Sequence, residues 1–574
     1  PISTLFPYTT LFRSLHVHSR YSNRPSEWIL RRIGAPECYV DPRDIYRQAR
    51  AKGMDFVTIS DHNTIAGALE IADLPGVFLS AEVTTYFPED GCKIHVLVHG
   101  ITEKQFAAID QARESIYDLR EYLVREDIVH SVAHPLFAVN EKLDLRHVEK
   151  LVVLFNRFET LNGTRHLEAN RLLSVLLDSL TPDVIAELAD THGIAPFGEA
   201  PWMKCRIGGS DDHSGIYIAS AHTVTPATQS VADFIDLLRR GQHQPGGEAG
   251  TSLQLAHGFY RIGYMYYRQR LLDNGKDSAL FSSLFRRMAG ESPAPSQETP
   301  LRRLGKRLLA PWRARRLNGV ERQLLTEFSA LFGQLQEREA AAAAETPATR
   351  SDRQTFELAS RISQQIGYQF MRNFVSHLRD MSFIESLQTL ASLAPVALSM
   401  APYVAAFKTQ HKDDALLAAV SNRFNVTSAG RSAPRKAWVT DTFSDINGVA
   451  RTIRTLGSMA CGKGHAMTVM TCLEEAPRET GLNLRNFEPV GMFDVPEYAG
   501  QRLAFPPFME ILETLERERF TEVIISTPGP MGLAALAGAK LLGLRTSGIY
   551  HTDFPKYVEV LTEDAAMAQA TWRS

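Results

Sequence analysis

The sequence predicts an α/β protein of three parts: an N-terminal α/β domain that closes into a barrel, a helical connector, and a second α/β domain with an open sheet. The chain has 574 residues, more than one hydrophobic core usually organises. Strand-like apolar runs alternate with helical stretches in both end regions, whereas long amphipathic helical patterns fill the middle. We therefore divide the chain into residues 1–14, 15–250, 251–435 and 436–574.

The composition indicates an ordinary folded soluble protein, with 44% hydrophobic and 22% charged residues. A formal net charge of −3 gives no electrostatic reason to expect a nucleic-acid partner. The 5 cysteines are scattered and form no CxxC pair, which favours a reducing compartment. Because no early segment has the pattern of a signal peptide, we expect a cytoplasmic protein.

Residues 1–14 need a separate explanation. The run Thr4–Ser14 resembles the conceptual translation of a sequencing adapter, which would have replaced the natural N-terminus. The alternative is a natural apolar tail. We treat the segment as an artefactual tail and leave it out of the fold prediction.

In the first domain, apolar runs at 56–59, 77–79, 94–98 and 128–132 predict strands. Apolar side chains at three- and four-residue spacing predict covering helices, for example at 42–52 and 103–125. This alternation is typical of an α/β barrel.

The connector holds an uncharged apolar stretch, residues 386–407, that is almost long enough to cross a bilayer. Pro395 and Pro402 argue against a simple span. We expect a buried helical hairpin there, and peripheral contact with the inner membrane stays open as an alternative. The basic stretch 302–316 is compatible with that alternative.

Histidines and carboxylates recur at the ends of the predicted strands. His16 and His18 are two apart on a strand, so both side chains leave from one face. Loops after the carboxyl ends of barrel strands meet at one face, where a metal centre can form. Any one of these residues is more often a packed or surface residue, but together they predict such a centre. The candidate ligands are His16, His18, His62, Glu82, His95, His134, Asp211 and His213.

On these residues the segment 15–250 resembles the polymerase and histidinol phosphatase (PHP) superfamily, metal-dependent phosphoesterases with a distorted (β/α)7 barrel. The resemblance implies that His16, His18, Glu82 and Asp211 surround one metal. It further implies that His62 and His213 hold a second metal, and that Glu82, His95 and His134 hold a third, with a metal-bound water as nucleophile. Mixed imidazole and carboxylate ligands suit manganese, zinc or iron, in two or three sites.

Several further residues qualify this resemblance. Ser14 stands where the family has an aspartate, and Asn23 stands where close relatives often have a ligand aspartate. Asp61 and Glu159 are expected to orient ligand side chains rather than bind metal.

From residue 436 a strand leads through Asn447–Gly448 into a helix, and another leads through Ser526–Leu533 into a second helix. With the run Gly548–Pro555, these motifs resemble the N-terminal half of family-four glycosyltransferases, which have the GT-B fold with two Rossmann-like halves. The resemblance implies a nucleotide-sugar donor and assigns substrate binding to Asn447, Gly448 and His551, with His551 also a catalytic candidate. The second, donor-binding half is not expected in this chain, so this half-domain is incomplete.

We therefore interpret the chain as a bifunctional bacterial enzyme fragment that joins a phosphoesterase to part of a glycosyltransferase. The substrates implied are a phosphorylated small molecule, lipid or glycan, and a lipid or glycan acceptor. Two alternatives stay open: the first domain is a non-catalytic regulatory module of the transferase, or it is a nuclease.

Overall fold

The computed structural model describes residues 10–25, 27–267, 269, 394–426, 434–477, 481–494 and 502–549, together with short pieces between 352 and 372. The chain forms two compact units. Unit 1 lies within residues 1–297 and 405–431, and unit 2 lies within 298–404 and 432–574.

Unit 1 contains two sheets. One has the strand order β2-β1-β8-β9, and the other has the order β3-β4-β5-β6-β7. The bounds are β1 Thr10–Ser14, β2 Met54–Val57, β3 Ser80–Phe87, β4 Cys92–His99, β5 Val129–Val132, β6 Arg157–Asn162, β7 Cys205–Gly209, β8 Ala221–Pro226 and β9 Gln244–Gly247.

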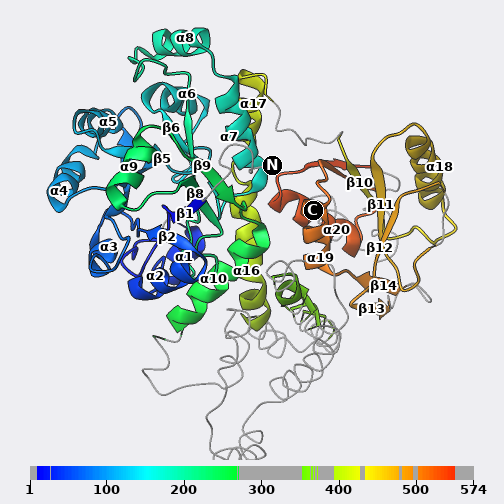
Figure 1. The fold of residues 1–574 in the computed structure, drawn as a ribbon. Helices are drawn as coiled ribbons and strands as arrows, with labels where there is room; N and C mark the ends of the chain where they lie inside the picture. Colours follow the sequence, from blue (N-terminus) through cyan, green and yellow to red (C-terminus); the bar gives the residue numbers. More distant parts are fainter. Residues whose placement is uncertain are drawn as a thin grey trace, which may run out of the picture. The chain divides into compact units, whose positions relative to one another are not determined.

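Helices surround these sheets (Figure 1). Several begin with a side-chain cap, such as Asp41 before α2 and Thr102 before α4, because the first backbone N–H groups of a helix need acceptors. The bounds are α1 Trp28–Ile33, α2 Pro42–Ala51, α3 Ala66–Glu70, α4 Glu103–Ala112, α5 Ile116–Arg125, α6 Leu145–Leu154, α7 Leu167–Ser179, α8 Pro182–His192, α9 Val231–Arg239 and α10 Ser252–Tyr267.

The α/β class predicted for unit 1 is confirmed, with three local differences. β3 and β4 form an antiparallel hairpin with no helix between them, and β5, which follows α4 and α5 in the chain, pairs antiparallel with β4. The expected strand at 77–79 reduces to an isolated bridge between Val57 and Val77. The expected single helix 103–125 is two helices, because the Ser115 side chain accepts from Asp118 N and starts a new one.

Backbone hydrogen bonds join the two sheets at the ends of their strands. Asn63 N, after β2, donates to Glu82 O of β3 at 2.9 Å, and His18 N, after β1, donates to Asp212 O, after β7, at 3.1 Å. An isolated parallel bridge also joins His62 to Glu82. The described strands form two sheets rather than one continuous sheet, so closure into a seven-stranded barrel stays a prediction.

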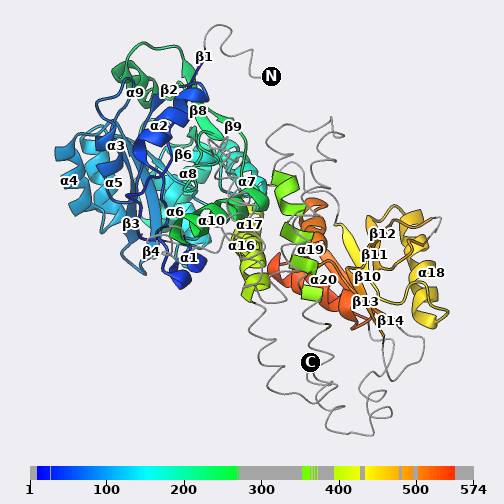
Figure 2. The ribbon, with the colours of Figure 1, turned by 90° about the horizontal axis from the view of Figure 1, so that it is seen from below.

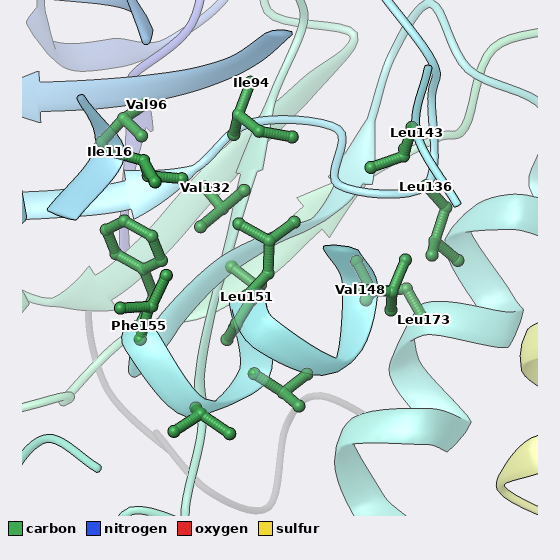
Figure 3. Close-up of a cluster of buried hydrophobic side chains, with 14 of the residues drawn as sticks. Ile94, Val96, Ile116, Val132, Leu136, Leu143, Val148, Leu151, Phe155 and Leu173 are labelled. Atoms are coloured by element: carbon green, nitrogen blue, oxygen red, sulfur yellow. The ribbon is translucent and has the colours of Figure 1, made fainter. Parts of the chain in front are cut away.

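The main core of unit 1 lies between the sheet β3–β7 and its helices (Figure 3). Ile94, Val96 and Val132 on the strands meet Leu151 and Phe155 from the end of α6, and all five are at most 4% exposed. Burial of such side chains contributes about 1.5–3 kcal/mol each, which holds the strand ends in a fixed arrangement.

Residues 10–14, which the sequence analysis assigned to an artefactual tail, form the strand β1 between β2 and β8. The artefactual origin of the segment stays a prediction, because backbone pairing accepts almost any side chain. The side chains fit less well. Arg13 is fully buried, and its Nε and Nη2 have no hydrogen-bond partner, although Nη1 pairs with Asp55 at 3.1 Å.

The connector residues 405–426 pack with unit 1. They include the end of α16 (Ala394–His411) and α17 (Asp414–Arg423), and Val420 and Val426 join the main core. Pro402 lies inside α16. Among the described residues no helix is long and apolar enough to cross a membrane. The remainder of the expected hairpin, residues 386–393, and the stretch 302–316 lie outside the described residues.

Unit 2 contains a five-stranded parallel sheet with the order β12-β11-β10-β15-β16. Helix α18 covers one face, and α19 and α20 cover the other (Figures 1 and 2). This order is that of a Rossmann-like open sheet, as expected. The bounds are β10 Lys436–Val439, α18 Gly448–Gly462, β11 Met467–Cys472, β12 Leu484–Phe487, β13 Gly491–Asp494, β14 Arg502–Phe505, α19 Phe508–Arg517, β15 Glu522–Ile525, α20 Pro530–Leu541 and β16 Arg545–Gly548.

Candidate metal centre

The eight candidate ligands lie on the same end of the unit 1 strands. His16 and His18 follow β1, His62 follows β2, and His134 follows β5. Glu82 lies near the start of β3 and His95 lies on the neighbouring β4, opposite Thr84, while Asp211 and His213 follow β7. The sheet topology therefore brings together residues up to 197 positions apart (213 − 16).

Four ligand atoms form a compact, fully buried cluster. His16 Nε2 lies 3.2 Å from His18 Nε2. Glu82 Oε2 lies 3.2 Å and 3.1 Å from these two nitrogens, and Asp211 Oδ1 lies 3.3 Å and 3.4 Å from them. Ligands about 2.05 Å from a tetrahedral metal ion lie about 3.3 Å from each other. The four atoms thus have the separations that a divalent ion at their centre requires.

Glu82 faces two groups of histidines with its two oxygens. Oε2 lies 3.0 Å from His62 Nδ1 as well as next to the first cluster. Oε1 lies 2.9 Å from His95 Nδ1 and 3.1 Å from His134 Nε2. A carboxylate with histidine nitrogens at both oxygens has the geometry of a ligand shared between two ions.

A third group consists of His18, His62 and His213, whose ligand atoms lie within 4.8 Å of one another. The buried carboxylate beside it is Glu37, which sequence reasoning missed: Oε2 lies 3.4 Å from His62 Nε2, and Oε1 lies 4.0 Å from His213 Nε2. Asn23, in contrast, is exposed. Nothing in the local pattern around Glu37 distinguishes it from an ordinary loop carboxylate.

Acceptors behind the ligands hold three imidazole rings with Nε2 towards the cluster. His16 Nδ1 donates to Glu159 Oε1 at 2.8 Å, and His213 Nδ1 donates to Asp211 O at 2.9 Å. His18 Nδ1 donates to Ser22 Oγ at 3.0 Å. Such outer contacts fix the tautomer and leave the other nitrogen lone pair for a metal.

Asp61 contacts a candidate ligand through an intervening serine rather than directly. Its Oδ1 accepts from Ser22 Oγ at 2.8 Å and from Ser19 N at 2.7 Å. Ser22 in turn meets His18, so Asp61 supports the His18 ring rather than that of His62. Glu159, besides His16, accepts from His134 N at 3.0 Å.

The electrostatics of the cluster are those of a cation site. Burial alone lowers the pKa of His18, but hydrogen bonds to Asp211 and Glu82 raise it to about 9. Burial likewise opposes ionisation of Glu82, yet the neighbouring His62, His95 and His16 hold its pKa well below the usual range. Histidine protons here supply the positive charge that a divalent ion would bring, so metal binding releases protons.

Backbone strain concentrates at the same place. His134 and Asp211 have positive φ values of 29° and 49°. Residues other than glycine rarely adopt this region, and they persist there only when the surrounding structure holds them. At Gly209 any Cβ would collide with the Cβ of His16, so only glycine allows this close approach.

A pocket of about 720 Å³, including solvent at its mouth, opens from the cluster. Arg165 lines it, with its Nη2 3.6 Å from Asp211 Oδ2 and its Nε buried without a hydrogen-bond partner. Its guanidinium lies 3.5 Å from the Phe137 ring centroid, and Lys412 Nζ lies 3.7 Å from the same centroid. Arg165 thus places one cation beside the candidate ligands, and Lys412 contacts the same Phe137 ring.

His99 and the residues of unit 2 complete the list of candidates. His99 is buried beside Ser80, apart from the cluster, and burial lowers its pKa to about 3. In unit 2, the Asn447 side chain caps α18 by accepting from Ala450 N at 2.8 Å, and Gly448 is the first residue of that helix. His551 lies outside the described residues.

A buried carboxylate joins the two loops at the centre of the unit 2 sheet. Asp441 Oδ1 accepts from Met531 N at 2.8 Å, at the start of α20, and Oδ2 accepts from Thr527 Oγ1 at 2.8 Å. Burial raises the pKa of Asp441, and these donors oppose the rise. In an open parallel sheet, ligands bind where neighbouring connections leave in opposite directions, and these loops flank that point.

Comparison with known proteins identifies the second unit most clearly. Residues 446–573 match the model of Glycosyltransferase Family 4. The predicted resemblance to that family is confirmed for residues 446–573.

Other similarities extend over smaller shares or are more distant. The chain is 39% identical to an uncharacterized protein of Methanocaldococcus jannaschii over 64 residues, which are 11% of this chain and 36% of that protein. The match therefore spans about a third of the relative's length.

Two solved structures match the chain at low similarity. PsfC from Pseudomonas syringae is 16% identical, with a TM-score of 0.26, over 46% of this chain and 100% of that chain. A provisionally assigned metal-dependent phosphoesterase from Bifidobacterium adolescentis is 17% identical, with a TM-score of 0.21, over 35% of this chain and 87% of that chain.

Proposed function

We propose that unit 1 is a metal-dependent phosphoesterase, joined in one chain to a glycosyltransferase region. The observation that carries the proposal is the convergence of His16, His18, Glu82 and Asp211, in which each imidazole Nε2 lies 3.1–3.4 Å from a carboxylate oxygen of both acids. A buried group of two carboxylates and two imidazoles at such separations is costly unless a cation neutralises it.

Under this proposal the four residues hold one divalent ion, and Glu82 shares a second ion with His95 and His134. Glu37 joins His62 and His213 at a third position. Adjacent divalent ions supply a nucleophile at neutral pH and stabilise charge on the attacking and departing oxygens of a phosphoester. The side chains around the ions would bind and orient the substrate.

Arg165 is the residue that we expect to meet the phosphate. It lines the pocket beside Asp211, and its buried Nε is free to donate to an anion. A guanidinium offers donors in a planar fork that matches a phosphate, and Phe137 holds the plane of the fork in place. Glu159 and Ser22 keep His16 and His18 correctly oriented while the substrate binds.

The proposal is tested by supplying the full chain with Mn²⁺ and measuring hydrolysis of an aryl phosphate and an aryl phosphodiester. The His16→Ala, His18→Ala double variant should lose at least about a thousandfold in turnover, because a catalytic ion loses two ligands. His465→Ala, a histidine change in unit 2, should retain wild-type turnover. Undiminished hydrolysis by the double variant contradicts the proposal.

The same assay separates the alternatives. Hydrolysis of oligonucleotide ends in preference to small phosphoesters favours a nuclease. Absence of turnover together with less than one ion per chain favours a regulatory module.

For unit 2 we propose the acceptor side of sugar transfer from a nucleotide-sugar to a lipid or glycan. The support is the family match over residues 446–573 and the open parallel sheet, with Asn447 and Gly448 at the loop that starts α18.

A further inference from the structure

The pocket next to the candidate metal ligands is lined by two kinds of side chain. The polar side chains His62, His95, His134 and Asp211 belong to the candidate ligands. Apolar side chains also line the pocket, and we call them together the apolar wall: Leu30, Phe137, Val139, Leu255, Phe259 and Ile262. A ligand that fills the pocket therefore meets both charged groups and hydrocarbon.

Helix α10 supplies half of the apolar wall. Leu255, Phe259 and Ile262 are spaced four and three residues apart, so they lie along one face of the helix. Leu30 of α1 packs with Ile262, and both are at most 4% exposed. This packing makes the wall part of the folded core rather than a set of loosely held side chains.

The polar side chains near this wall already have partners. Glu27 accepts from Thr409 Oγ1 at 3.2 Å and lies 3.8 Å from Arg165. The Tyr217 hydroxyl bonds His257 Nδ1 at 3.2 Å. A substrate hydroxyl placed against the wall would exchange its water partners for hydrocarbon, which disfavours it.

On the basis of the proposed function, we infer that the substrate of unit 1 is a phosphate ester of an apolar alcohol, with an alkyl or aryl group. Its phosphate faces Arg165 and the metal ligands, and its hydrocarbon part lies along α10. Esters of polyhydroxy alcohols are disfavoured by the same wall. The pocket thus assigns a lipid-like or aromatic phosphate rather than a sugar phosphate.

Gly258 gives a way to test this arrangement. It lies on α10, lines the pocket, and would place a Cβ 3.6 Å from Ser214 Cβ, an ordinary contact distance. A side chain there would enter the pocket without a clash at its first atom. Gly263 on the same helix has no atom within 4 Å of its virtual Cβ, so it serves as a matched control.

The experiment measures binding of ethylphosphonate, propylphosphonate and hexylphosphonate to the Mn²⁺-loaded full chain by titration calorimetry, with hydrolysis of the matching alkyl phosphates alongside. Each added methylene should tighten binding roughly threefold to fourfold until the wall is covered. Glycerol phosphate, which carries two hydroxyls on the same three carbons, should bind at least about tenfold more weakly than propyl phosphate.

Gly258→Leu should reduce the preference for hexyl over ethyl by at least about tenfold, because its side chain occupies the volume of the longer group. Gly258→Ala should reduce it less, and Gly263→Leu should leave it unchanged. A thermal melt of each variant shows whether the fold is retained.

Equal affinity for ethyl and hexyl groups, or a preference for glycerol phosphate, overturns the inference even if esters are hydrolysed. Length-dependent binding without turnover upholds the apolar wall and contradicts the phosphoesterase proposal instead. The two failures are therefore distinguishable.

Discussion

The two units each bury carboxylates, but they satisfy them in opposite ways. In unit 2, Asp441 receives hydrogen bonds from Met531 N and Thr527 Oγ1, and backbone and hydroxyl donors serve both of its oxygens. In unit 1, Glu82 and Asp211 each turn an oxygen towards imidazole nitrogens that lie at metal-ligand separations. A carboxylate whose hydrogen-bond donors all come from the protein is thus part of the scaffold. A carboxylate that the protein surrounds with other potential metal ligands is part of a site.

Removal of metal should show the largest difference between the units. Ligands that bind only the native state stabilise it by RT ln(1 + [L]/Kd), about 4 kcal/mol at a thousandfold excess over Kd. Chelation should therefore lower amide protection in β4 and β5 of unit 1 and leave α20 of unit 2 unchanged, as measured by hydrogen exchange with mass spectrometry. Equal loss in both units would break the comparison.

A second experiment perturbs the carboxylate of unit 2 instead of the metal site of unit 1. Asp441→Ala removes the acceptor for Met531 N and Thr527 Oγ1, and unsatisfied buried donors cost about 1–3 kcal/mol. Protection of the α20 amides should fall by that amount, while the metal content of the chain stays constant. Asp445→Ala, an exposed carboxylate in the same loop, should change neither quantity.

A substitution of Glu159 tests how much the residue that orients His16 contributes to metal binding. In Glu159→Gln the neutral amide replaces the carboxylate that accepts from His16 Nδ1, so the ring is held less firmly and is less basic. We expect metal affinity, measured by competition with a chromogenic chelator, to fall about tenfold to a hundredfold. The exposed Glu121→Gln is the control, and an unchanged affinity would assign Glu159 to packing alone.

The smallest expected effect concerns pH and a histidine outside the cluster. Burial lowers the pKa of His99 to about 3, against an ordinary value of 6.5, so between these values the unfolded chain binds a proton that the folded chain does not. Stability should therefore fall as the pH drops from 6.5 towards 4, by about 1.4 kcal/mol per pH unit from this group. Urea unfolding of His99→Gln at pH 7.5 and pH 5 should show a correspondingly shallower decline, and an unchanged slope would contradict this assignment.

Much of the candidate site was predictable because parallel strands bring their carboxyl ends to the same end of a sheet. His16, His62, His134 and Asp211 each follow a strand, and that placement alone predicts that they meet. The ligand roles of the eight residues stay predictions, since geometry shows only that their atoms converge.

Glu37 could not be predicted, because it lies in a loop and reaches His62 only through tertiary folding. The β3–β4 hairpin was missed for a related reason. Its apolar runs have the pattern of buried strands but do not reveal which neighbour they pair with. In unit 2, Asp441 follows the strand β10, yet only its distances to Met531 and Thr527 reveal its role.

The strand β1 shows the limit of reasoning from composition. Residues 10–14 pair with β2 and β8 through the backbone, whatever the origin of the sequence. The side chain of Arg13 is nevertheless poorly accommodated, because burial lowers its pKa to about 10 despite the attraction of Asp55. Backbone pairing and side-chain fit are therefore separate tests of whether a segment belongs to its fold.

The central claim is that the buried histidine and carboxylate cluster of unit 1 holds divalent ions. Its most direct test is the metal content of the full chain after dialysis from Mn²⁺, determined by inductively coupled plasma mass spectrometry. We predict two or three ions per chain in the wild type and at least one fewer in the His16→Ala, His18→Ala variant. Less than one ion per wild-type chain would contradict the claim.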